Sequence, residues 1–183
     1  MKKQYTIQDI LGLVIDCFGQ KIESIFRGDK TLEPLEILED EMIGMIERVW
    51  FGLQVLSQKN QRLFVSDCMD SVLLSYEEEL LEEGIGLGEI RESLEVSRKY
   101  ARGEASLEEL RIASGSLNSI IASINLSEAS ETINYIISGV SCSLANYNYM
   151  IAVINAADFG DRKQLTKNLE ILIKYVKKEL KEL

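Results

Sequence analysis

The most informative absence in this 183-residue sequence is that of histidine, which occurs at no position. Without histidine, catalysis by a Ser-His or Cys-His pair is excluded, because the imidazole is the general base in both. Zinc held by histidine and the Glu-x-x-His metal sites of helical bundles are excluded for the same reason. So is the Arg-x4-His motif of some small helical ribonucleases. We therefore expect no catalytic residues of these kinds.

Proline and cysteine are also scarce. Pro34 is the only proline, so helices along the rest of the chain are not interrupted by this helix-breaking residue. The three cysteines, Cys17, Cys68 and Cys142, are far apart and lie among apolar neighbours. Such thiols are typical of small buried side chains in a reducing compartment, and no metal-binding cysteine pair is present.

Positive charge is in the minority, with 20 Lys and Arg against 30 Asp and Glu, and the net charge is −10. Binding to nucleic acid or to an anionic membrane surface requires basic residues, so neither partner is expected. An acidic protein instead attracts basic partners over long distances. The excess lies in residues 1–100, with 20 acidic and 11 basic residues, whereas residues 101–183 have 10 and 9.

Two apolar stretches invite comparison with secretory and membrane segments. The first, near the N-terminus, is interrupted by Asp9 and Asp16, so we expect a mature helix and a cytoplasmic protein. The second, residues 132–157, carries no charge but contains several Asn, Tyr and Ser residues, which are costly in hydrocarbon. We interpret it as part of a helix buried at the centre of the domain.

Apolar residues recur at helical spacing along the chain, and no stretch alternates like a strand. The expected fold is a single all-α domain over residues 1–183, a bundle of six to eight helices with the uncharged helix at its centre. In the second helix, Met42 is part of the apolar stripe. Helices are expected over residues 7–26, 34–56, 57–83, 89–102, 107–124, 128–157 and from 161 onward.

The stretch SRKYARGEASLEELRIA contains a helix end followed at once by a helix start. Gly103 suits a position of positive φ just after a helix that ends at Arg102. Ser106 and Glu109 have the spacing of a capping box, in which each side chain accepts a hydrogen bond from the other's backbone N–H. A join this short predicts an antiparallel helix pair.

Two further features are candidates for ligand binding. The loop GIGLG, residues 84–88, is rich in glycine but lacks the preceding strand and the following Lys-Ser/Thr of a phosphate-binding loop, so it predicts a plain connection between helices. Asp67 and Asp70 lie on one helical face, where a solvated acidic surface is favoured over a metal site. We expect neither metal nor cofactor.

Two motifs stand out on the third and fourth expected helices. The first is Arg-Leu-Phe leading into Asp-Cys, and the second has the form Glu-x-x-Arg-x-Tyr-x-x-Gly-Glu-Ala-Ser. Over residues 57–157 the chain resembles immunity protein family five of the bacterial polymorphic-toxin systems, although Asp70 stands where the family pattern has glutamate. The matching residues are Arg62, Leu63, Phe64, Asp67, Cys68, Glu95, Arg98, Tyr100, Gly103, Glu104, Ala105 and Ser106.

The resemblance implies a non-catalytic, all-helical, cytoplasmic protein that binds a toxin domain and neutralises it. The acidic first half of the chain fits a basic toxin. Two other interpretations stay open. One is a helical adaptor or regulatory protein with a different protein partner, and the other is an enzyme that uses a carboxylate-bound metal ion.

The partner-binding site is expected at the acidic end of the third helix. Carboxylates so close together repel one another, and negative charge near a helix C-terminus is unfavourable, so a basic partner would relieve an electrostatic cost. A solvated face without a partner is the alternative. The residues concerned are Glu77, Glu78, Glu79, Glu82 and Glu83.

Overall fold

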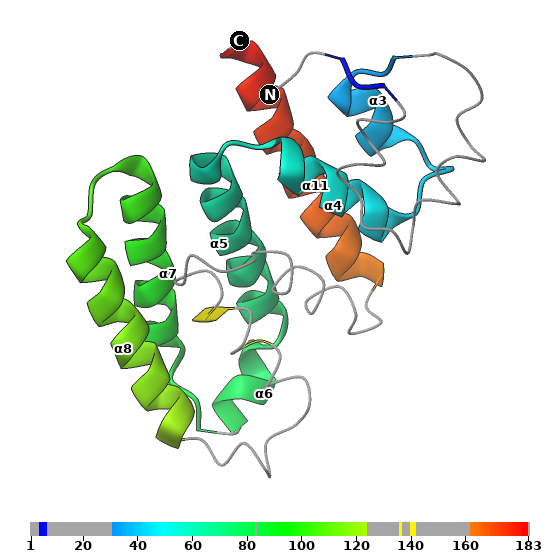
Figure 1. Cartoon of the computed structure of the whole chain (residues 1–183). Coiled ribbons are helices and arrows are strands. Elements are labelled where there is room, and N and C mark those ends of the chain that lie inside the picture. Colours follow the sequence, from blue (N-terminus) through cyan, green and yellow to red (C-terminus); the bar gives the residue numbers. More distant parts are fainter. Residues whose placement is uncertain are drawn as a thin grey trace. The chain divides into compact units, whose positions relative to one another are not determined.

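Figure 1 shows the chain as a computed structural model in which helices predominate. Within the described residues there are seven helices, and the only β-type pairing is an isolated antiparallel bridge between Tyr5 and Leu32. The all-α prediction with six to eight helices is confirmed. The structure describes residues 4–6, 31–82, 84–123, 136, 140–141 and 162–182.

Some of the helices predicted from the sequence cover residues that the structure does not describe. The helix expected over residues 7–26 and most of the uncharged helix expected over 128–157 lie outside the described residues. From the latter, Ile136 and Val140 are described, and both are buried.

The chain divides into two compact units, of which the first contains residues 1–57 and 165–183 and the second residues 58–164. The expectation of a single domain over residues 1–183 stays a prediction.

The first unit is packed tightly around a glycine. A Cβ added at Gly52 would overlap the side chain of Leu172 and lie 3.0 Å from Leu38, so only glycine allows these residues to pack here. The rings of Tyr5 and Phe51 meet edge to face, with their centroids 5.2 Å apart. The unit contains α3 (Pro34–Glu39), α4 (Met45–Val55) and all but the first turn of α11 (Arg162–Lys181).

The prediction of one helix over residues 34–56 is wrong, because a turn at residues 40–44 separates α3 from α4. The carboxylate of Asp40 accepts a hydrogen bond from the backbone N–H of Met42 (2.9 Å), and its carbonyl accepts one from Ile43 (3.1 Å). Asp favours such local turns over helix continuation. Consequently Ile43 is buried, whereas Met42, which was expected in the apolar stripe, is 71% exposed.

The second unit is built around α5 and α7. Figure 1 shows α7 beside both α5 and α8. Residues 62–66 of α5 are all buried, and five consecutive residues exceed one helical turn, so α5 is covered on every side at this level. The helices of the unit are α5 (Gln58–Ser75), α6 (Glu77–Glu82), α7 (Leu87–Arg102) and α8 (Leu107–Ser123).

The prediction of one helix over residues 57–83 is also wrong, because the chain turns at Tyr76 between α5 and α6. The Ser75 hydroxyl donates to the carbonyl of Ser71 (3.0 Å), a bond that competes with the helical ladder and favours a bend. The acidic run is therefore a separate short helix.

The join between α7 and α8 agrees with the sequence prediction. Gly103 has φ of 77°, and the N–H of Glu104 donates to the carbonyl of Lys99 (2.8 Å), which closes the helix end. The Glu109 carboxylate accepts from the Ser106 N–H (2.7 Å), while the Ser106 hydroxyl accepts from the Glu109 N–H (3.2 Å). The backbone N–H of Ser106, and secondly its hydroxyl (2.8 Å), donate to the Glu109 carboxylate and hold the pKa of Glu109 below its ordinary value.

The helix pair is antiparallel, as expected. Ser93 and Ala113 are equally far in sequence from Gly103, and the Ser93 hydroxyl donates to the Ala113 carbonyl across the pair (3.5 Å). The connection between helices that was expected at GIGLG is shorter than residues 84–88. Gly84 (φ 74°), the buried Ile85 and Gly86 connect α6 to α7, whereas Leu87 and Gly88 already belong to α7.

We expect Gly103→Ala to lower the free energy of unfolding by about 1–2 kcal/mol, because an L side chain is strained at positive φ. Gly115→Ala is the matched control. Gly115 lies inside α8, and an added Cβ there meets no atom within 4 Å, so alanine should stabilise by about 0.5–1 kcal/mol. Urea unfolding of the two variants measures both changes, and equal effects would contradict the helix end placed at Gly103.

Candidate functional site

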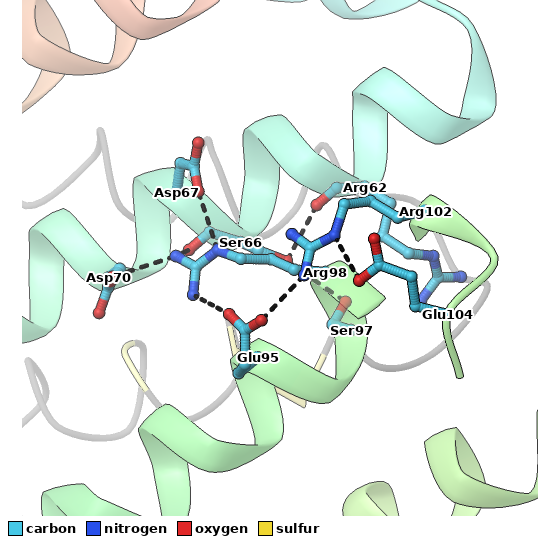
Figure 2. A network of polar contacts seen from close by, with 9 residues as sticks. All are labelled: Arg62, Ser66, Asp67, Asp70, Glu95, Ser97, Arg98, Arg102 and Glu104. Carbon is cyan, nitrogen blue, oxygen red and sulfur yellow. Dashed lines mark hydrogen bonds and ion pairs between the residues drawn. The ribbon is translucent and has the colours of Figure 1, made fainter. Parts of the chain in front are cut away.

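The α5–α7 interface contains an arginine with three acceptors from α5 (Figure 2). Arg98 on α7 donates from Nε to Asp67 (2.9 Å) and from Nη2 to Asp70 (3.1 Å) and to the Ser66 carbonyl (3.1 Å). The Arg98 side chain is 15% exposed, whereas the two carboxylates are 38% and 37% exposed. A single cation therefore neutralises two carboxylates that would otherwise repel each other on one face of α5.

A second arginine extends this network toward the end of α7. Glu95 lies between Arg98 (3.7 Å) and Arg102 (2.9 Å), and Arg102 also donates to Glu104 just after the helix (2.8 Å). The hydrogen bonds to Glu104 and Glu95 raise the pKa of Arg102. Cations near a helix C-terminus are favoured by the helix dipole, so these contacts support the end of α7.

Further polar groups bind α5 to α7 on the buried side of the network. The Arg62 guanidinium lies 5.0 Å from the centre of the Tyr100 ring, a cation–π contact, and Arg62 is buried. The hydroxyls of Ser66 and Ser97, both fully buried, lie 3.3 Å apart within hydrogen-bonding distance. These buried polar contacts pack α5 against α7.

The cysteine of the first motif is buried and free, as expected for a structural thiol. Burial, and secondarily the nearby charge of Asp67, raises the pKa of the Cys68 thiol well above its ordinary value. A nucleophilic cysteine needs the thiolate form, so the surroundings of Cys68 disfavour a nucleophilic role. The other two cysteines lie outside the described residues.

Most of the residues that carry the family resemblance thus form contacts between the helices of the second unit or shape the join between α7 and α8. Asp67, Arg98, Glu95 and Glu104 belong to the polar network. Gly103 and Ser106 shape the join between α7 and α8. We call the contacts of Arg98 with Ser66, Asp67, Asp70 and Glu95, which hold α7 against α5, the arginine clamp.

The acidic residues expected to bind a partner lie together on α6. Glu77, Glu78 and Glu79 form the first turn of α6, and Glu82 is its last residue. Glu83 lies outside the described residues.

The glutamates of α6 do not all lie near a helix C-terminus, as the sequence prediction assumed. Because the chain turns at Tyr76, three glutamates lie at a helix N-terminus, where negative charge is favoured rather than opposed. Glu77 also pairs with Arg91 of α7 (3.5 Å). Part of the expected electrostatic cost is therefore already relieved within the unit.

Leucines beside the glutamates add an apolar component that the sequence prediction missed. Leu74 is 62% exposed and Leu81 is 57% exposed. Both line an open hollow of about 560 Å³, together with Ser75, Tyr76, Glu77, Glu78 and Glu79. We call the exposed set the acidic–leucine surface, which consists of Leu74, Glu78, Glu79, Leu81 and Glu82.

The described ranges contain no group of three acidic or cysteine residues that could hold a metal ion. None of the described helices is long and apolar enough to cross a membrane. No protein-family model, curated protein or solved structure matches the chain.

We expect Arg98→Met to lower the free energy of unfolding by about 1–3 kcal/mol, because Asp67 and Asp70 would lose their shared cation. Arg111→Met is the control, since Arg111 pairs with Glu108 at 3.8 Å but is 70% exposed, and its loss should change stability by less than about 0.5 kcal/mol. Urea unfolding at neutral pH checks both. Similar effects of the two variants would show that the clamp contributes no more than a surface ion pair.

Proposed function

We propose that this protein is a non-catalytic, immunity-type inhibitor that binds a basic toxin domain through its acidic–leucine surface and thereby neutralises the toxin. The observation that carries the proposal is the combination of exposed Glu78, Glu79 and Glu82 with exposed Leu74 and Leu81. Carboxylates attract a basic partner and set its orientation, and exposed leucines supply apolar area that a protein partner can bury.

The charge of the whole chain supports a basic partner. A net charge of −10 attracts a cationic protein over long distances and speeds its encounter with the surface. In the second unit, Glu78, Glu79 and Glu82 are exposed and have no ion pair with another described residue. Their charge is therefore available to a partner, whereas the carboxylates of the arginine clamp are engaged by arginines.

The arginine clamp supports the proposal in a second way. It explains the residues of the resemblance as contacts between helices, so the exposed glutamates and leucines around α6 remain available to a partner. The missing histidine and the buried Cys68 agree with a function that requires no catalytic group.

The proposal is tested by co-expressing the chain in bacteria with the product of the neighbouring reading frame and scoring growth. Wild type should restore growth, and the triple variant Glu78→Lys, Glu79→Lys, Glu82→Lys should not. With purified proteins, the triple variant should associate at least about tenfold more slowly and with weaker dependence on salt. The loss follows from reversed charge at the contact.

A matched control carries the same charge change elsewhere. Glu41, Glu170 and Glu182 are exposed and lie in the first unit, so their triple replacement by Lys should lower the association rate much less. If both triple variants slow association equally, only net charge matters and α6 is not the contact. Binding of the partner without any effect on growth would favour the adaptor interpretation instead.

A further inference from the structure

The hollow at the turn between α5 and α6 has two kinds of wall. Leu74 comes from the last turn of α5 and Leu81 from α6, so the turn at Tyr76 brings two exposed leucines to one depression. Glu77, Glu78 and Glu79 line the same hollow, and the described lining includes no basic residue. The hollow thus presents apolar area and negative charge at once.

Exposed large apolar side chains are few in the described residues. They are Met42, Leu74, Leu81, Leu107 and Ile112, and two of these five line the hollow. Single exposed apolar residues are ordinary on a surface, whereas two leucines that line one depression can be buried together by one side chain of a partner.

We infer that the hollow receives one apolar side chain of the partner, of the size of Leu, Met or Phe, which is flanked in the partner's sequence by Lys or Arg. This inference rests on the proposed function and specifies the segment that the acidic–leucine surface recognises. The apolar side chain would contact Leu74 and Leu81, while the flanking cations would face Glu78, Glu79 and Glu82. Charge complementarity supports a basic segment, and the leucines require an apolar anchor.

Smaller cationic ligands fit the hollow less well. A polyamine would engage the carboxylates but would leave Leu74 and Leu81 with little new contact. A divalent cation needs converging carboxylates, and none of the described residues form such a group.

The inference is tested by selecting a random peptide display library on the full chain. Enriched peptides should share an apolar residue flanked by Lys or Arg, and a synthetic peptide of the enriched sequence should bind in a fluorescence-anisotropy titration. Leu74→Ser/Leu81→Ser should weaken that binding at least about tenfold, as expected for loss of a contact hot spot. Both leucines are exposed, so these replacements leave the core intact.

Leu107→Ser/Ile112→Ser is the matched control, because these residues are 45% and 61% exposed on α8, away from the hollow. The affinity of this control variant for the peptide should equal that of wild type. Enrichment of purely cationic peptides or of uncharged peptides would overturn the inference. So would enriched peptides that bind the Leu74→Ser/Leu81→Ser variant as tightly as they bind wild type.

The outcome is separable from that of the proposed function. If Leu74→Ser/Leu81→Ser still restores growth with the co-expressed toxin while the triple Glu→Lys variant does not, the immunity function stands with the glutamates alone as its contact, and the apolar anchor is refuted. If the peptides behave as expected but no neighbouring product is neutralised, the anchor stands and the immunity function is refuted.

Discussion

The second unit depends on keeping the Arg98 guanidinium satisfied between two helices. Because this group donates to Asp67, Asp70 and the carbonyl of Ser66, α5 and α7 are held in one register. The short join at Gly103 then fixes α8 against α7, and the ion pair of Glu77 with Arg91 ties α6 to the same helix. A residue pattern that resembles a family motif is thus explained by interhelical contacts, and the surface that we propose for partner recognition is a different one.

The part of the structure that sequence predicts well is governed by local chemistry. Gly103 ends α7 because it adopts a positive φ, and Ser106 starts α8 through side-chain capping. Both effects involve residues only a few positions away, so they can be predicted from the sequence. The helical content likewise follows from the helical spacing of apolar residues and from the scarcity of proline, which occurs only once. The glutamates of α6 could be named from the sequence for the same reason, since their clustering needs no knowledge of the fold.

What sequence did not predict depends on tertiary structure. The turn at Tyr76 interrupts a continuous helical pattern, and it goes with the Ser75 hydroxyl bonding to a backbone carbonyl of its own helix. The exposure of Leu74 and Leu81 is decided by which neighbouring elements cover them, and the apolar spacing along the sequence does not reveal it. The clamp of Arg98 pairs residues about 30 positions apart, as between Arg98 and Asp67 (31 positions), so no local signal reveals it.

In our proposal the second unit consists of a scaffold, held by the arginine clamp, and a partner-binding surface on α6. Amide hydrogen exchange, measured on the full chain alone and in complex with the neighbouring gene product, tests this division most directly. We predict slower exchange on binding in residues 74–82 and unchanged exchange in residues 93–106. Protection confined to the end of α7 and its join with α8, with none at α6, would contradict the account, because the motif residues would then form the contact.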